Sequence, residues 1–389
     1  MFVRLFLGLL FTAMILPVVA APLSPADRDA VRQQQEQLLL YTQQQRDELE
    51  RATPLPQPAP AVPVAPSQGP CFSLTTISLT GVTLIPTREQ QRLLAPWRNR
   101  CLTLADITRL TDSVSDWYIS RGYITSRAFL TEQDLSHGEL TLVVLEGKLR
   151  AIQLDGKTPR MLKMAFPGLN GKVLNLRDIE QGMEQINRLR TEPVQIEILP
   201  DAEPGYSVVN LTARPEFPLS ASLSLDNSGQ KSTGEKQLTG TLYANNIAGL
   251  ADKWFISGGR SSDFATAYDA QNFQAGLSVP FGYTLLDYSY SWNNYRTTFT
   301  NSGFDWISTG DSKTHRFNAS WVAFRNGDVK TALAATVTQR STRNWLNDAL
   351  LASSSRNLSS LTLGINHTWK VSGGRGHLQP GIQPRHALV

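Results

Sequence analysis

Hydrophobic and polar residues follow a different pattern in each part of the chain, and the first pattern is a short apolar run. Residues 5–16 are mostly apolar, Arg4 precedes them, and Pro17 and small residues follow. This order is typical of a secretory signal peptide, which we place at residues 1–20 with cleavage before Ala21. The alternative is an N-terminal membrane anchor, but the run is too short for a membrane-spanning helix.

Residues 21–52 carry a helical pattern with few apolar positions. Strong helix formers follow Ser24 and Pro25, and Leu38, Leu39 and Leu40 stand among many polar residues such as Gln43. This helix cannot bury a large face by itself. It is either a solvated or coiled-coil helix, or one that lies in a water-filled cavity. Residues 53–70 hold seven prolines, which predicts an extended, semi-rigid linker.

The next 145 residues or so read as two small α/β repeats, at 71–147 and 148–215. In the first, Thr103 and Asp106 have the spacing of a capping box that opens a helix, and a strand pattern follows at 139–145. Each repeat has the order strand, helix, helix, strand, strand, although two unrelated small domains would be the alternative. The predicted elements are 72–84, 88–94, 104–121, 123–130 and 139–145, then 149–154, 160–166, 176–189, 193–199 and 206–213.

From residue 219 onward, apolar and polar residues alternate in segments of about ten, which is typical of membrane β-strands. We count eight such strands, joined by short turns at 249–252, 280–282 and 326–327 and by long polar loops at 260–271, 296–313 and 339–356. A soluble antiparallel sandwich would also alternate. Aromatic residues near the strand ends favour a membrane, where they would form an interfacial girdle: Tyr243, Trp254, Phe273, Trp306, Trp345 and Trp369.

Composition narrows the function without naming it. The 389 residues are 41% hydrophobic and 18% charged, a composition that excludes a wholly disordered chain. The 37 Lys+Arg against 33 Asp+Glu give a net charge of +4, which does not indicate nucleic-acid binding. In an exported chain the two cysteines, Cys71 and Cys101, are expected to form a disulfide. No metal-ligand spacing or enzyme motif appears. Ser228 and Lys231 have the SxxK spacing of some enzymes, but they lie in a predicted turn and no accompanying motif is present. We therefore expect no cofactor and no enzymatic activity.

Three segments resemble the two-partner secretion transporters, the haemolysin/adhesin secretion and activation proteins of the Omp85 superfamily: 122–149, 174–189 and 223–254. The resemblance implies α+β POTRA repeats followed by an all-β transmembrane antiparallel β-barrel, which has sixteen strands in the family. It also implies that residues 21–52, with Leu38, Leu39, Leu40 and Gln43, plug the pore. The strand-and-turn motif of the barrel would be Asp226, Asn227, Gly229, Thr233, Gly234, Asn245, Asn246 and Asp252.

The same resemblance implies a Gram-negative outer membrane location with the POTRA repeats in the periplasm, and export of a large unfolded exoprotein. The partners would be that exoprotein, through its N-terminal secretion domain, and outer-membrane lipid. A repeat of this kind can bind an extended chain by β-augmentation. Tyr118, Tyr123 and Phe129 are candidates for the binding groove, although aromatic residues at regular spacing commonly fill a core.

The chain departs from the family pattern at its C-terminal end. It stops after the eighth predicted strand, which leaves a partial barrel at 216–372, and residues 373–389 show no alternation. We expect a C-terminally truncated chain, in which incomplete barrels could associate or which could act only as a periplasmic polypeptide-binding module. The family's Val-Arg-Gly-Tyr loop is absent, and Arg121, Gly122 and Tyr123 are predicted to end a helix instead.

Overall fold

The computed structural model describes residues 71–371 except 228 and 262, together with 374–378, 381–382 and 385–388. The predicted signal peptide (1–20), helix (21–52, with Leu38, Leu39, Leu40 and Gln43) and linker (53–70) lie outside the described residues. Ser228 does too. Within the described part of the chain, no helix combines the length and the apolar content needed to cross a membrane.

The first repeat, residues 71–147, packs helices against a three-stranded sheet in the order β2-β5-β4. β2 runs parallel to β5 and β4 antiparallel to it. A separate two-stranded sheet joins β1 and β3; β3 is short, and the sequence did not predict it. The elements are β1 (Cys71–Leu74), β2 (Thr76–Thr80), α2 (Thr87–Leu94), the 3-10 helix η1 (Ala95–Trp97), β3 (Arg100–Thr103), α3 (Leu104–Ser120), β4 (Arg127–Leu130) and β5 (Glu139–Leu145).

The second repeat, residues 148–215, has the same topology, with β6 parallel to β8 and β7 antiparallel to β8. Its elements are β6 (Lys148–Leu154), α4 (Arg160–Ala165), α5 (Leu176–Asn187), β7 (Gln195–Pro200) and β8 (Tyr206–Thr212). One apolar stripe of α5, formed by Ile179, Met183 and Ile186, enters the core of this repeat. In the first repeat Ile107, Leu110 and Val114 of α3 do the same. Leu104 is exposed because it is the first residue of α3.

The remaining strands form one antiparallel sheet in which sequence neighbours pair from β9 to β15, and β15 then pairs with β17. These are the eight long strands that the alternation predicts. The elements are β9 (Leu219–Asp226), β10 (Gln237–Asn245), β11 (Lys253–Ser261), β12 (Asp269–Phe281), β13 (Thr284–Asn301), β14 (Phe304–Arg325), β15 (Val329–Leu346), β16 (Ala349–Leu350), β17 (Arg356–Val371), β18 (Gly374–Leu378), β19 (Gly381–Ile382) and β20 (Arg385–Leu388).

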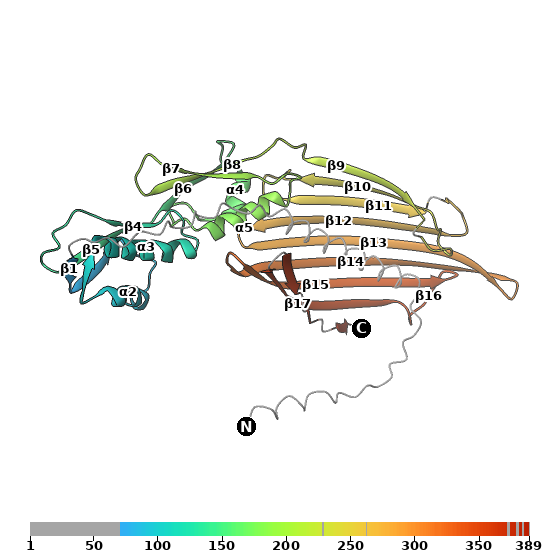
Figure 1. The fold of residues 1–389 in the computed structure, drawn as a ribbon. Helices are drawn as coiled ribbons and strands as arrows, with labels where there is room; N and C mark the ends of the chain where they lie inside the picture. Colours follow the sequence, from blue (N-terminus) through green and yellow to red (C-terminus); the bar gives the residue numbers. More distant parts are fainter. Residues whose placement is uncertain are drawn as a thin grey trace, which may run out of the picture.

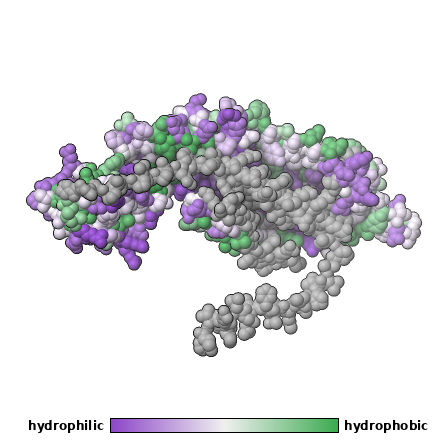
Figure 2. All heavy atoms as spheres, viewed as in Figure 1, coloured by the Kyte–Doolittle hydropathy of each residue, from purple (hydrophilic) through white to green (hydrophobic). Residues whose placement is uncertain are grey.

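Figure 1 shows the two repeats in line beyond one end of these strands. We call the strand ends that face the repeats the near rim and the opposite ends the far rim. The register aligns the alternating residues into two faces. The apolar face is exposed and carries large side chains in every long strand, among them Leu223, Leu242, Ile256, Phe273, Tyr288, Trp321, Leu333 and Leu363. In Figure 2, hydrophobic residues lie along the upper margin, over β9 and β10.

Two of the predicted long loops are wrong, because β13 to β15 are longer than expected. β13 and β14 meet at the two-residue turn Ser302-Gly303, and β15 meets β16 at Asn347-Asp348. All four turn residues have positive φ, as in the type I′ turns that close tight hairpins. At the far-rim ends of these strands both faces are largely polar. The alternation therefore disappears there, although the strands remain paired. Residues 263–268, which precede β12, lie in a loop as predicted.

The tail predicted at 373–389 also differs from expectation. β18, β19 and β20 are short strands, and all three pair with β17. The six aromatic residues of the predicted girdle do not share one face. By register, Trp254, Phe273, Trp345 and Trp369 lie on the apolar face, whereas Tyr243 and Trp306 lie on the polar face.

Candidate functional site

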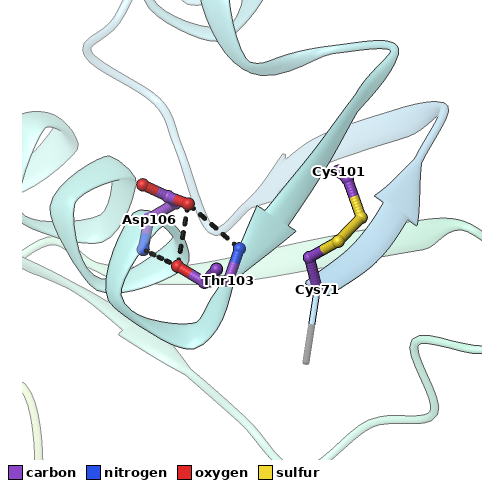
Figure 3. Close-up of a disulfide and its surroundings, with 4 residues drawn as sticks. All are labelled: Cys71, Cys101, Thr103 and Asp106. Carbon is purple, nitrogen blue, oxygen red and sulfur yellow. Dashed lines mark hydrogen bonds between the residues drawn. A yellow bond between two sulfur atoms is a disulfide. The ribbon is translucent and has the colours of Figure 1, made fainter. Parts of the chain in front are cut away.

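The start of α3 is fixed by a disulfide and a capping box (Figure 3). Cys71 in β1 is bonded to Cys101 in β3, as the sequence predicts. The main-chain N–H of Asp106 donates to the Thr103 hydroxyl at 3.3 Å, and the Thr103 N–H donates to the Asp106 carboxylate at 3.0 Å. Hydrogen bonding from Thr103 lowers the pKa of Asp106. Residues 71 and 101–106 therefore form a stapled corner of the first repeat.

Tyr118 is part of the core of this repeat and cannot line a groove, so this prediction is wrong. Its side chain is 0% exposed, and its hydroxyl donates to the Glu146 carboxylate at 2.7 Å. Glu146 is also buried and accepts hydrogen bonds from the N–H groups of Thr83 (2.8 Å) and Leu84 (2.9 Å) and from the Thr83 hydroxyl. Burial raises the pKa of Glu146, but these bonds outweigh burial and leave it lowered.

The other two groove candidates lie in different places. Tyr123 packs partly buried against the core of the first repeat, with its ring edge-on to Tyr118. Phe129 in β4 is 48% exposed and lies opposite Val143 on the sheet face that points away from the helices. Leu145 and Leu199 are exposed on the equivalent faces of the two repeats, and neither was singled out from the sequence. The signal was present, since each is an apolar residue at an outward position of an alternating strand.

The two repeats meet at the loop that follows α3. α3 ends at Ser120, and Gly122 adopts φ +94°, so the predicted helix stop at Arg121, Gly122 and Tyr123 is confirmed. The Gly122 carbonyl accepts a hydrogen bond from the N–H of Leu176, the first residue of α5, at 2.8 Å. Ile124 packs on the core of the second repeat. A Cβ at Gly147 would lie 2.4 Å from the Thr125 hydroxyl, so this linker position requires glycine.

The second repeat in turn docks on three turns of the near rim, and the first is residues 246–252. Ala251 is 0% exposed and belongs to the hydrophobic core of the second repeat, although it lies in the large sheet's chain segment. Its carbonyl accepts a hydrogen bond from Arg188 at 2.7 Å, and the Asn246 amide donates to the Met161 sulfur at 3.3 Å. The buried Asp252 carboxylate shapes the turn by accepting from the N–H groups of Ala248 and Leu250 and from the Trp254 indole.

The second turn, at 282–283, contacts the end of α4 and the first turn of α5. The Gly282 N–H donates to the Met164 carbonyl at 2.8 Å, and a Cβ at this position would lie 2.8 Å from the Pro167 ring. The Tyr283 hydroxyl donates to the Asp178 carboxylate at 2.6 Å. Burial and this carboxylate raise the pKa of Tyr283.

The third turn, at 326–328, is flanked by charged side chains that face α5. Arg325 donates to Glu180 at 3.3 Å and to Gln181 at 3.0 Å, and it pairs with Glu184 at 3.0 Å. Lys330 also pairs with Glu184, at 2.5 Å. These two cations hold the pKa of Glu184 below its usual range despite its burial. The α5 residues that contact the rim recur at helical spacing, and so do those that enter the core. The helix therefore presents a polar stripe to the rim and an apolar stripe to the core.

The predicted strand-and-turn motif divides between the two rims. Asn245, Asn246 and Asp252 lie at the near rim, in or beside the turn that holds Ala251. Asp226, Asn227, Gly229, Thr233 and Gly234 lie at the far rim, at the end of β9 and in the loop to β10. There Thr233 is buried, and Gly234 has φ +107° and lies so close to Ser261 that a Cβ would not fit. The structure therefore brings each subset together but keeps the two subsets apart.

The polar face of the sheet carries a ladder of side-chain hydrogen bonds. Asn318 donates to Asp287 at 3.0 Å and accepts from the Thr336 hydroxyl at 2.8 Å, which links β13, β14 and β15. Nearer the far rim, the Tyr295 hydroxyl donates to Asn344 at 3.1 Å. Across the described ranges, no group of His, Cys, Asp or Glu is arranged to hold a metal ion. This face can offer hydrogen bonds to water or to an extended chain.

Comparison with known protein families gives consistent matches along the described part. Residues 205–384 match the family described as haemolysin secretion/activation protein ShlB/FhaC/HecB. Residues 72–147 match the ShlB-type POTRA domain, and residues 148–200 match a POTRA domain.

Individual relatives are similar over most of this chain. The outer membrane transporter CdiB of Escherichia coli is 57% identical over 364 residues, which is 93% of this chain and 62% of the relative. CdiB of Dickeya dadantii is 51% identical over 93% of this chain and 64% of the relative. The solved structure of CdiB from Escherichia coli superimposes with a TM-score of 0.88 at 56% identity, covering 94% of this chain and 68% of that one. The chain thus spans less than two thirds of the length of these two transporter sequences.

Proposed function

Because the chain belongs to the haemolysin secretion/activation family ShlB/FhaC/HecB, we propose that it acts in the export of an unfolded polypeptide across an outer membrane. In this proposal residues 71–147 and 148–215 are two POTRA domains and residues 216–372 belong to the membrane sheet. The observation that carries it is the docking of the second repeat on three turns of one rim. This contact places the repeats directly beside the end of a sheet with one apolar and one polar face.

The two faces of the sheet give the location its physical basis. Large apolar side chains are exposed on one face in strand after strand, and none of the described elements covers them. Lipid would cover this face, whereas the polar face with Asp287 and Asn318 would line the route for the exported chain. The repeats would then lie in the periplasm. The relatives bearing the printed name CdiB are outer membrane transporters rather than enzymes, and we assign no enzymatic step to this chain.

The outer edge of β9, at residues 219–225, is part of the proposal. Among the described strands β9 pairs only with β10. Its remaining main-chain N–H and C=O groups cannot be satisfied by lipid. We propose that a further strand pairs there, for example one from a second copy of the chain.

The polypeptide partner would bind first to the outward sheet faces of the repeats. Phe129, Leu145 and Leu199 are exposed there by 48%, 44% and 40%, and Leu145 contacts the second repeat beside Gly205. Exposed apolar side chains on neighbouring strands suit an extended chain with its own apolar residues. We therefore keep Phe129 as a binding residue and add Leu145 and Leu199 to it, with Tyr123 as a supporting side chain.

Export itself is the first test. Cells that contain this chain as their sole transporter of the family should release the cognate exoprotein to the medium, measured by immunoblot of culture supernatants. Retention of all exoprotein in the periplasm, with the chain present in the outer membrane, would refute export. If the periplasmic exoprotein then still co-purifies with the chain, the function is polypeptide binding without transport.

Binding is tested separately by calorimetry on the purified chain with the exoprotein's N-terminal secretion domain. Phe129→Ser should raise Kd about tenfold, since truncating an exposed aromatic anchor costs on the order of 1–2 kcal/mol. Leu104→Ser is the matched control, because Leu104 is 59% exposed but lies on α3. Equal effects of the two substitutions would argue against a specific role of the sheet face.

A further inference from the structure

The contacts between α5 and the near rim change in kind from one end of the helix to the other. At its C-terminal end, Ala251 is fully buried in the core of the second repeat, and Arg188 donates to the Ala251 carbonyl and, at 3.1 Å, to the Ser278 hydroxyl. In the preceding turns of the helix, the contacts are the Tyr283–Asp178 hydrogen bond and ion pairs of Glu180 and Glu184. The same helix is therefore held by apolar insertion at its C-terminal end and by polar and charged contacts in the turns before it.

The charged contact across the junction joins Glu180 and Glu184 of α5 to Arg325 of β14 and Lys330 of β15, and Arg177 of α5 also pairs with Glu180 at 2.6 Å. Arg325 is the centre, because its side chain is only 11% exposed and it contacts both carboxylates. Every ion pair that crosses the junction has its cation on the sheet and its carboxylate on the repeat, whereas the Arg177–Glu180 pair lies within the repeat. Attraction between such groups falls with added salt and reverses with one charge reversal, whereas burial of Ala251 responds to neither.

We propose that this junction is a hinge with a charged latch. The second repeat pivots at turn 246–252, and the latch formed by Glu180, Glu184, Arg325 and Lys330 opens and closes. Opening would also break the Tyr283–Asp178 hydrogen bond, which joins the middle turn of the rim to the first turn of α5. The motion would uncover the near rim at β14 and β15 while the repeat stays attached through Ala251. This inference concerns which contact yields, so it does not require that the chain exports a polypeptide.

The hinge is tested by measuring two distances in the purified full chain by double electron–electron resonance. Both native cysteines are joined in the disulfide, so spin labels can be attached to introduced cysteines. A pair at Lys172 and Asp328 reports on the latch, and a pair at Thr191 and Ile247 reports on the pivot. All four positions are exposed.

Arg325→Glu should shift the latch distance to longer values by several Å and leave the pivot distance unchanged. The shift is measurable because α5 has 12 residues and is about 18 Å long, so its N-terminal end moves most. The new carboxylate would repel Glu180 and Glu184, although Arg177 and Lys330 would remain beside them. Arg325→Glu combined with Glu184→Arg should restore part of the short distance. Arg296→Glu reverses the charge of an exposed arginine of β13 and should change neither distance.

The unchanged pivot distance also shows that the variant is folded and docked. If Arg325→Glu lengthens both distances, the repeat detaches as a whole and there is no pivot. If neither distance changes, the charged cluster is not a latch. Either result overturns the proposal.

Discussion

The two repeats share a topology but are stabilised in different ways. The first repeat contains its own reinforcements, namely the Cys71–Cys101 disulfide and the buried Glu146 carboxylate with its four hydrogen bonds. The second repeat has no cysteine, and its core includes Ala251 from a turn of the sheet. The comparison indicates that the first repeat can remain folded independently of the sheet, whereas the stability of the second depends on its docking.

The largest effect should come from breaking that docking with Ala251→Asp. Aspartate tolerates the backbone here, since Ala251 has φ +57° and Asp is enriched at such positions, so the cost comes from burial of an unpaired charge. We expect a loss of about 4 kcal/mol from the free energy of unfolding of the second repeat. Hydrogen exchange should show lost protection in α4, α5 and β6, with β5 and α3 unaffected.

Ala248→Asp is the control for this substitution, because Ala248 lies in the same turn but is exposed. It should leave the exchange pattern unchanged. If the first repeat loses protection together with the second in the Ala251→Asp variant, the two repeats do not differ in their dependence on the sheet.

Removal of the disulfide should have the next largest effect, and on the first repeat. The sequence separation of the two cysteines is 30 residues. Closing a loop of that length is worth about 3 kcal/mol in the chain-entropy account. The double substitution Cys71→Ser and Cys101→Ser should therefore lower the thermal unfolding midpoint of the first repeat while exchange in α5 stays as it was. Equal loss in both repeats would contradict independent reinforcement.

Local sequence signals account for most of the fold but not for the contacts that distinguish the repeats. The capping box of Thr103 and Asp106 and the alternation in β5 are properties of a few consecutive residues, and both are as predicted. By contrast, Arg325 and Glu184 are 141 residues apart in sequence, and nothing near either residue indicates its partner. Ala251 likewise reads as an ordinary turn residue. Its role follows only from the way the turn meets a core built by another segment.

Glu146→Gln should destabilise the first repeat by about 2 kcal/mol, because one buried acceptor oxygen is replaced by an amide that cannot accept from its present donors. With the wild-type carboxylate we also expect stability to fall at low pH, and we call this part of the pH profile the acid limb. The folded pKa of Glu146 is lowered from the ordinary value of 4.5, so its stabilisation is complete above pH 4.5 and is lost as the pH falls through the folded pKa.

Unfolding of the purified chain between pH 3 and pH 7, followed by near-ultraviolet circular dichroism, should be less acid-sensitive in Glu146→Gln than in the wild type. Glu139→Gln removes an exposed carboxylate of β5 and should retain the wild-type acid limb. An unaltered limb in Glu146→Gln would mean that other carboxylates control acid unfolding.

The smallest effects should come from the two helix N-caps, and they sharpen the comparison because the caps have different surroundings. Thr103 caps α3 within the first repeat, whereas Asn175 caps α5 by accepting from the Arg177 N–H and also donates to the Arg121 carbonyl of the first repeat. Each substitution by alanine should cost about 1 kcal/mol. Thr103→Ala should reduce exchange protection in α3 alone, but Asn175→Ala should reduce it both in α5 and in the loop at residues 121–126. Confinement of the Asn175→Ala effect to α5 would mean that the Gly122–Leu176 main-chain bond joins the repeats without help from this side chain.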